Sequence, residues 1–183
     1  MKIDVFGIVR GHLATLYDIK SNRLDLDDMI IFFVIPIVLA ALPWLTTLSI
    51  AKEGFNVSIT FFGIFVALLL NIQVAIFSVF QREWREIANP RSRKLQAEEL
   101  KDRNKLLGEI NTNISYLMII GCFALASFLG LYLATSAQSL IDSLLGRIAS
   151  SFCIIVYAHF LLTFLMVVKR AHALFQKEYR DHA

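Results

Sequence analysis

The chain contains four long segments without a single charged residue, and this pattern constrains its fold more than any other feature. The segments are residues 29–50, 57–80, 114–134 and 148–168, and charged stretches separate them. A helix rises 1.5 Å per residue, so about 20 apolar residues cross the roughly 30 Å hydrocarbon layer of a bilayer. Only 18% of the residues are charged, against about 25% in a soluble domain. The sequence therefore predicts an all-α, polytopic membrane protein with four transmembrane helices.

Lysine and arginine are distributed unevenly between the connecting segments. Sixteen of the 18 lie in residues 1–28, 81–113 and 169–183, and the other two lie in residues 51–56 and 135–147. Because positive residues stay on the cytoplasmic side of a membrane, this distribution places both termini and the middle loop in the cytoplasm. The chain is therefore predicted to cross the membrane several times.

The first apolar segment follows a charged leader instead of a short basic region with a cleavage site, so a cleaved signal peptide is not expected. In this leader Val5, Val9 and Leu13 recur at helical spacing, which predicts an amphipathic helix. Such a helix either lies in the lipid headgroup layer or packs against the cytoplasmic helices of its own or a neighbouring subunit.

The middle loop is predicted to be a helical hairpin. The helical pattern of the second span continues to Asn89, where the following proline disfavours helical geometry. A second tract of good helix formers then runs directly into the third span. The predicted domains are a cytoplasmic leader (1–28), a four-helix transmembrane domain (29–168) that includes the cytoplasmic hairpin (81–113), and a cytoplasmic tail (169–183).

Four residues of this hairpin are candidates for docking a cytoplasmic protein partner, or a nucleoprotein: Trp84, Arg91, Arg93 and Lys94. An aromatic residue just inside the membrane either anchors at the interface or docks a partner. The basic cluster invites comparison with a phosphate-binding patch. However, residues 81–113 carry six acidic residues beside eight basic ones, which favours a mixed, solvated helix surface. Direct nucleic-acid binding is not predicted.

Small residues recur every four positions on two of the spans. The second span carries Gly63, Ala67, Asn71 and Ala75, and the third carries Cys122, Ala126, Gly130 and Ala134. Small residues let helices approach closely, and an amide can then bond across the contact. We therefore expect Gly63, Ala67, Ala126 and Gly130 to pack helices together, within a subunit or between subunits.

Three polar residues inside the spans, Asn71, Gln73 and His159, are candidates for lining a pore or a polar contact. Gln73 lies about 200° around the helix from Asn71, so the two amides need different partners. In a single four-helix bundle one of them would face lipid at a cost on the order of 1 kcal/mol or more. This pattern predicts a homo-oligomer in the lipid bilayer.

His159 lies near the middle of the fourth span, and its interpretation stays open. A histidine can change its charge near neutral pH, which makes it a functional candidate. The alternative is a neutral ring that is hydrogen-bonded to a neighbour such as Asn71 or Ser127. In the first span, Pro36 and Pro43 should bend the helix and free carbonyl groups that need other partners.

The sequence lacks the motifs of common enzymes, including a phosphate-binding glycine loop and a zinc-binding His-Glu-x-x-His. Its two cysteines, Cys122 and Cys153, both fall inside predicted spans, away from other metal-ligating residues. An enzyme is therefore not expected, and neither a cofactor, a metal nor a catalytic residue is predicted.

The opening segments VFGIVRGHLATLYD and RLDLDDMIIFFVIP resemble the start of the first span in small membrane proteins of bacterial anti-phage defence operons. The plan of four spans, cytoplasmic ends and a helical cytoplasmic loop is similar to that of the Kiwa membrane subunit and of the transmembrane effectors paired with retrons. This resemblance implies an oligomeric inner-membrane protein that couples a cytoplasmic partner to the membrane.

The resemblance implies an effector that disturbs membrane integrity, with two alternatives left open. One is a non-conducting membrane sensor or scaffold that recruits the cytoplasmic partner. The other is a small ion or solute channel unrelated to defence. The orientation of Gln73, Asn71 and His159, toward water or toward protein, distinguishes the channel-like from the scaffold-like interpretation.

Overall fold

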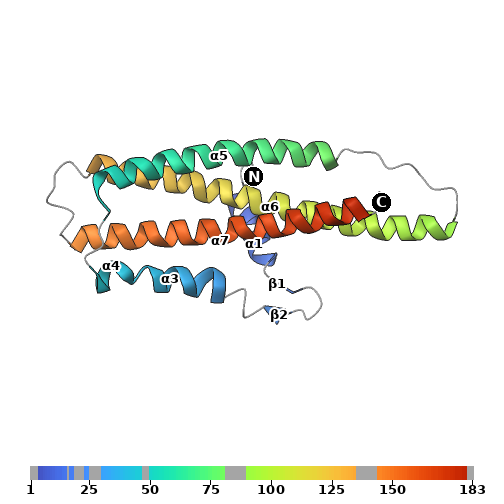
Figure 1. Cartoon of the computed structure of the whole chain (residues 1–183), viewed down its shortest axis with the longest axis horizontal. Helices are drawn as coiled ribbons and strands as arrows, with labels where there is room; N and C mark the ends of the chain where they lie inside the picture. The colour runs from blue at the N-terminus through green and yellow to red at the C-terminus, as the bar shows by residue number, and fades with distance from the viewer. Residues whose placement is uncertain are drawn as a thin grey trace.

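Three long helices lie side by side and form the body of the molecule (Figure 1). They are α5 (Lys52–Phe80), α6 (Pro90–Ala134) and α7 (Leu144–Arg180), and each is long and apolar enough to cross a membrane. The computed structural model describes residues 4–15, 17–18, 23–24, 30–46, 50–80, 90–134 and 144–180. In this part of the chain the strands are two residues each, β1 (Tyr17–Asp18) paired antiparallel with β2 (Arg23–Leu24). The fold is helical, as predicted.

The first predicted span is not a membrane-length helix. It is divided into a π-helical turn, η1 (Ile30–Val34), and two short helices, α3 (Ile35–Leu39) and α4 (Leu42–Leu45). Together they cover Ile30–Leu45, which is shorter than the roughly 20 residues that a straight spanning helix needs. Pro36 and Pro43 each lie in the first turn of a new helix, because proline has no N–H to continue the preceding one. The two prolines therefore interrupt the first helix instead of only bending it. Three of the four predicted spans have membrane-length helices in the described residues.

Phenylalanine rings lie in the bundle interior together with leucine, isoleucine and valine side chains. Phe62 of α5, Phe128 of α6 and Phe160 of α7 are fully buried, with the Phe62 ring centroid 5.5 Å from that of Phe128 and 5.0 Å from that of Phe160. Aromatic pairs at this separation gain energy beyond the area that they bury. Apolar side chains also cover much of the outside, for example Val74, Leu133 and Leu165. An apolar exterior around a packed core is what a helix bundle in lipid requires.

The contact between α5 and α6 depends on a glycine that the sequence did not single out. A Cβ atom added to Gly121 would lie 2.7 Å from Cγ2 of Val66, which is closer than carbon atoms pack. Gly121 therefore fixes how closely α5 and α6 approach.

Two serines of α7 hold the far end of the interrupted segment. The Ser151 hydroxyl donates to the carbonyl oxygen of Ala40 at 2.8 Å and accepts from Nε1 of Trp44 at 3.0 Å. The backbone N–H of Ile50 donates to Oγ of Ser150 at 3.0 Å. The carbonyl that is left where α3 ends thus finds its partner on a neighbouring helix, as a backbone group in lipid must.

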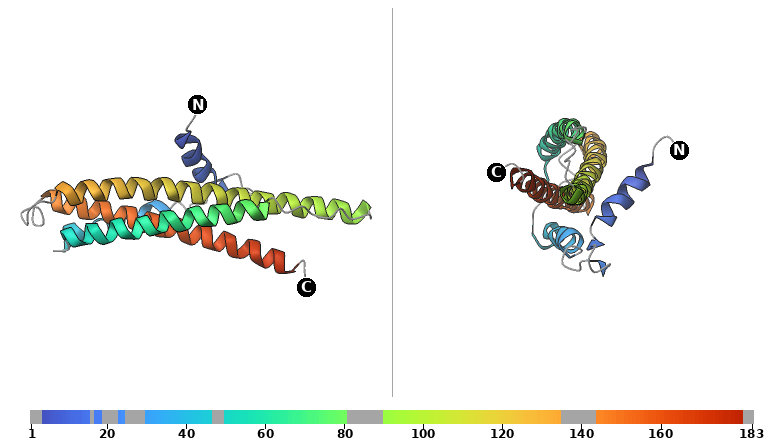
Figure 2. Two further views of the ribbon diagram at one scale, coloured as in Figure 1. Left: turned by 90° about the horizontal axis from the view of Figure 1, so that it is seen from above. Right: turned by 90° about the vertical axis from the view of Figure 1, so that its right-hand side faces the viewer.

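The N-terminal helix α1 (Val5–Ala14) lies beside the bundle and runs roughly perpendicular to its long helices (Figure 2). In the view along the bundle, α5, α6 and α7 are seen end-on while α1 is seen lengthwise, with its N-terminal end projecting outward. Asp4 caps the helix by accepting a 2.8 Å hydrogen bond from the N–H of Gly7. At its other end Gly11 lies directly against Thr112 of α6, where a Cβ atom would be 3.0 Å from the Thr112 methyl group. Of the two positions expected for the leader helix, the structure shows packing on a helix of its own chain.

Candidate functional site

A cluster of buried and half-buried polar side chains joins α1 to the bundle. It connects α1 and η1 to α6 and α7, and we name it the α1 clamp; its members are His12, Thr15, Asn113, Tyr116, His159 and Arg170. Polar groups buried at such a depth are expensive unless they are hydrogen-bonded. The clamp is therefore the strongest candidate for a functional site in the described part of the chain.

His159 receives its partners because Pro36 interrupts the first predicted span. Proline has no N–H to donate to the carbonyl four residues earlier, that of Phe32, and Nδ1 of His159 lies 3.3 Å from this oxygen. Since a carbonyl only accepts, Nδ1 carries a proton, and Nε2 lies 2.8 Å from the Tyr116 hydroxyl, which can donate or accept. Both ring nitrogens of His159 thus have partners, although these are not the expected Asn71 or Ser127.

His12 is the member of the clamp that α1 contributes, and it is completely buried. Its ring stacks on that of Tyr116, with the centroids 3.9 Å apart, and its Nδ1 lies 2.7 Å from Oδ1 of Asn113. The Thr15 hydroxyl lies 3.1 Å from the same Oδ1 and 2.7 Å from the His12 carbonyl. Asn113 therefore contacts the last turn of α1 and the residue that caps it.

Arg170 of α7 holds the C-terminal end of α1. Its guanidinium donates to the carbonyl oxygen of Thr15, the residue that ends α1, at 2.6 Å, and it lies 3.6 Å from a carboxylate oxygen of Glu109. A cation at a helix C-terminus satisfies a carbonyl that the helix leaves open and complements the helix dipole. Arg170 thus joins α1, α6 and α7 through one side chain.

Burial keeps His12 neutral. Removal from water lowers the pKa of His12 from 6.5 to about 4; the hydrogen bond with Asn113 opposes this shift, while His159 and Arg170 reinforce it. A histidine whose pKa falls on docking stabilises the docked state above its free pKa and loses that contribution as the pH falls toward the docked pKa. The clamp should therefore be intact above pH 6.5 and weaken below it.

Lowering the pH from 7.5 to 5 should weaken the docking of α1 by about 30-fold, the ratio that these two pKa values give. A ten-residue helix is marginal alone in water, so amide protection factors in α1, corrected for the intrinsic pH dependence of exchange, report docking. In the matched His12→Gln variant the 30-fold effect should be lost, and only a smaller pH dependence from the other histidines should remain. An equal pH response in both proteins would show that His12 is not the titrating group.

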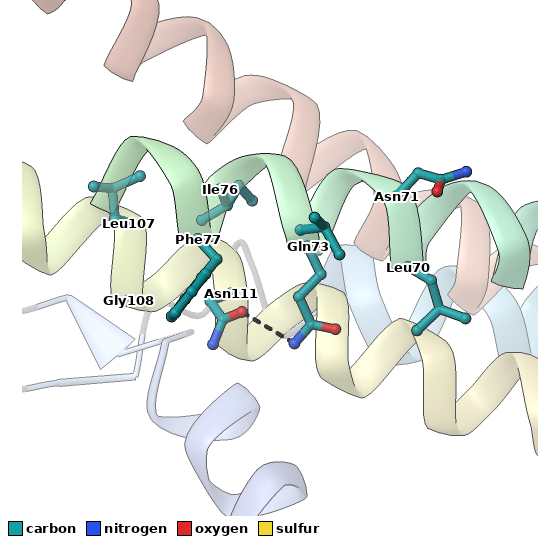
Figure 3. A pocket seen from close by; sticks show the side chains of 9 residues that line it. Leu70, Asn71, Gln73, Ile76, Phe77, Leu107, Gly108 and Asn111 are labelled. Atoms are coloured by element: carbon teal, nitrogen blue, oxygen red, sulfur yellow. Dashed lines mark hydrogen bonds between the residues drawn. The ribbon is translucent and has the colours of Figure 1, made fainter. Parts of the chain in front are cut away.

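Gln73 has partners within its own chain. Its Nε2 donates to Oδ1 of Asn111 at 3.1 Å and lies 3.2 Å from Oγ of Ser115, both on α6 (Figure 3). Asn71 is exposed instead and points away from α6. The expected roles are reversed, because the α5 face that meets α6 is the one that carries Gln73. One of the two amides, Asn71, thus stays on the outside of a single chain, which is the condition from which the homo-oligomer was predicted; the homo-oligomer stays a prediction.

These residues line an open groove between α5 and α6 with a volume of about 690 Å³. Apart from Asn71, Gln73 and Asn111, its walls are apolar, including Leu70, Val74, Ile76 and Phe77 of α5. The Gln73–Asn111 hydrogen bond bridges α5 and α6 at this groove (Figure 3).

The small-residue stripes face outward. Ala67, Ala126 and Gly130 are exposed, and a Cβ atom added to Gly63 or Gly130 would meet nothing within 4 Å. The stripes therefore do not pack against each other within one chain, and their role in contacts between subunits stays a prediction.

The candidate docking residues give no further information. Trp84 lies outside the described residues, and so do the side chains of Arg91, Arg93 and Lys94, although their backbone belongs to α6. Among the residues that the structure describes, histidine, cysteine and carboxylate side chains form no group of three that could hold a metal ion.

Sequence reasoning missed most of the clamp. His12 and Asn113 were passed over because each looks ordinary in its own segment: one lies on an amphipathic leader, the other just before a span. A weak signal was present, since Asn111, Asn113 and Ser115 place amides and a hydroxyl where α6 becomes apolar. Their partners come from segments about 100 residues away, which no local pattern identifies.

Comparison of the chain with protein-family profiles, with curated proteins and with solved structures finds no match in any of the three. The functional argument therefore rests on the geometry of the clamp and on the membrane character of the helices.

Proposed function

We propose that the protein is a bacterial inner-membrane component that couples a cytoplasmic partner to the membrane, as its resemblance to the membrane proteins of anti-phage defence systems implies. The observation that supports this proposal most is the α1 clamp. It ties α1 and the charged parts of α6 and α7 to His159, a residue within a spanning segment. A partner that displaced α1 or moved the ends of α6 and α7 would disturb hydrogen bonds inside the membrane domain.

Of the mechanisms considered, the geometry favours a non-conducting sensor or scaffold for the clamped state. In the described residues, Gln73 and His159 both have protein partners, Asn71 points to the outside of the bundle, and buried apolar side chains such as Phe62 and Phe160 pack the bundle interior. A conducting path needs polar groups that face water. An effector that disturbs the membrane would therefore have to open its path between chains, or only after the clamp is released.

Membrane potential measured in growing cells distinguishes these mechanisms. We expect that expression of the wild-type protein causes no depolarisation, and that a clamp-releasing variant, Arg170→Met, causes none either. Depolarisation by Arg170→Met alone would favour an effector that the clamp restrains, and depolarisation by the wild type would favour a channel. Gln73→Leu is the control variant. It removes hydrogen bonds to α6 that lie outside the clamp, so it should behave as the wild type does.

The defence role has its own test. A host that carries the gene with its neighbouring genes should reduce the plating efficiency of at least some phages, and Arg170→Met should abolish that reduction at unchanged protein level. Equal plating with and without the gene, across a broad phage panel, would contradict the defence role. The coupling mechanism is tested separately, by the amide protection factors in α1.

A further inference from the structure

The outward side of α1 carries apolar residues that nothing in the described chain covers. Phe6 is 85% exposed, Leu13 41% and Val5 39%. At 3.6 residues per turn, these three and Val9 fall within an arc of about 100° on the helix. Gly7, Arg10 and Ala14 occupy the adjacent arc and are also exposed. Outside its contact with the bundle, α1 therefore has an apolar edge and a more polar edge.

The depth of α1 along the bundle is fixed by its contacts with α6. Gly11 and His12 meet Thr112 and Asn113, and Glu109 is the last charged residue of α6 before its apolar segment. A lipid–water boundary lies where charged residues give way to a long apolar run. The α1 helix is thus docked at the level of this boundary.

The direction of α1 matches the boundary as well. Bundle helices that cross a membrane lie roughly along its normal, and α1 lies across the bundle (Figure 2). It therefore extends along the membrane plane. Its apolar edge adjoins His12, which stacks on Tyr116. Its polar edge adjoins Gly11, which meets Thr112, one turn nearer the charged part of α6. The apolar edge is thus on the side of the apolar segment of α6. A helix with these properties binds in the interface, with its apolar side at the boundary between headgroups and acyl chains.

We propose that α1 is an interfacial helix whose partner is the lipid surface, into which the Phe6 and Leu13 side chains insert while Arg10 and Ala14 stay near water. The proposal depends only on the bundle spanning a membrane and not on the proposed function. It also explains why the bundle-facing side of α1 uses polar contacts: lipid supplies the apolar contact, and the clamp fixes the position of the helix.

Spin-label accessibility of the full-length protein in nanodiscs of phosphatidylethanolamine and phosphatidylglycerol tests this directly. Nitroxides are attached at Phe6→Cys, Leu13→Cys and Ala14→Cys, in a Cys122→Ala background; Cys153 is kept because it is fully buried. Leu13 and Ala14 are neighbours in sequence but lie about 100° apart around the helix, so they form a matched pair.

We expect labels at positions 6 and 13 to collide several-fold more with oxygen, which partitions into lipid, than with a water-soluble nickel chelate. The label at position 14 should show the reverse preference. High nickel accessibility at all three positions would place α1 in water and overturn the proposal. Low accessibility to both reagents, with an immobilised spectrum at position 6, would also overturn it, because another protein chain would then cover that side.

Discussion

Replacing Gly121 with leucine should destabilise the bundle by about 3 kcal/mol, the upper range for forcing extra carbon atoms into a packed contact. The first added atom would already lie 2.7 Å from the Val66 side chain, so α5 and α6 would have to separate. Separation would also lengthen the hydrogen bonds of Gln73 to α6, farther along the same contact. Unfolding of the purified protein in detergent micelles by a denaturing detergent measures this loss.

The matched control is Gly130→Leu, the same change on the same helix. Gly130 is exposed and a Cβ atom there meets nothing within 4 Å, so the stability of a single bundle should be nearly unchanged. If the outward stripes join subunits, as the sequence predicts, Gly130→Leu should instead reduce the size of the detergent-solubilised oligomer. Equal destabilisation by both substitutions would show that Gly121 has no special place in the α5–α6 contact.

Replacing Arg170 with methionine should release α1 from the bundle. The change keeps an unbranched apolar stem but removes a charge-assisted hydrogen bond to the Thr15 carbonyl and the pairing with Glu109. Hydrogen bonds to charged groups contribute about 1.5–3 kcal/mol, which corresponds to a roughly 10- to 100-fold decrease of the amide protection factors in α1. Hydrogen exchange of the protein in nanodiscs measures these factors.

Lys169→Met is the matched control for this prediction, because Lys169 is the neighbouring cation, is exposed, and loses the same charge. It should leave α1 protected. A second readout concerns coupling: in Arg170→Met, the nitrogen NMR signals of His159 should change, because release of α1 removes the stacked neighbour of Tyr116. Loss of protection in α1 without any change at His159 would mean that the clamp holds α1 but transmits nothing to the span.

The long helices were predictable because each depends on its own sequence. An uncharged segment of membrane length must form all its backbone hydrogen bonds internally in lipid, so the second, third and fourth predicted spans follow from composition and length. The extension of α6 back to Pro90 follows from helix formers that continue without a break. Pro36 and Pro43 were expected to disturb the first span, but the sequence underestimated how far they shorten its helices.

The partners of the polar residues were not predictable in the same way. The geometry of one helix correctly separates Asn71 from Gln73 around its axis, but it does not say which side faces α6. In the structure that side carries Gln73, and Asn71 is exposed. Helical spacing likewise identified the small-residue stripes without showing that both face outward, while the close approach occurs at Gly121.

By itself, the sequence determined that this chain is helical, that its second, third and fourth apolar segments form helices of membrane length, and that a short amphipathic helix precedes them; it predicted the same length for the first apolar segment, where the structure describes only short helices. These properties are local, because backbone hydrogen bonding in lipid and helical periodicity act within a segment. Only the tertiary structure decided that His12, Asn113, Tyr116, His159 and Arg170 form one cluster. The reason is physical: a buried polar group is stabilised by whichever partner the packing brings within hydrogen-bonding distance, and packing depends on the rotation and depth of every helix at once.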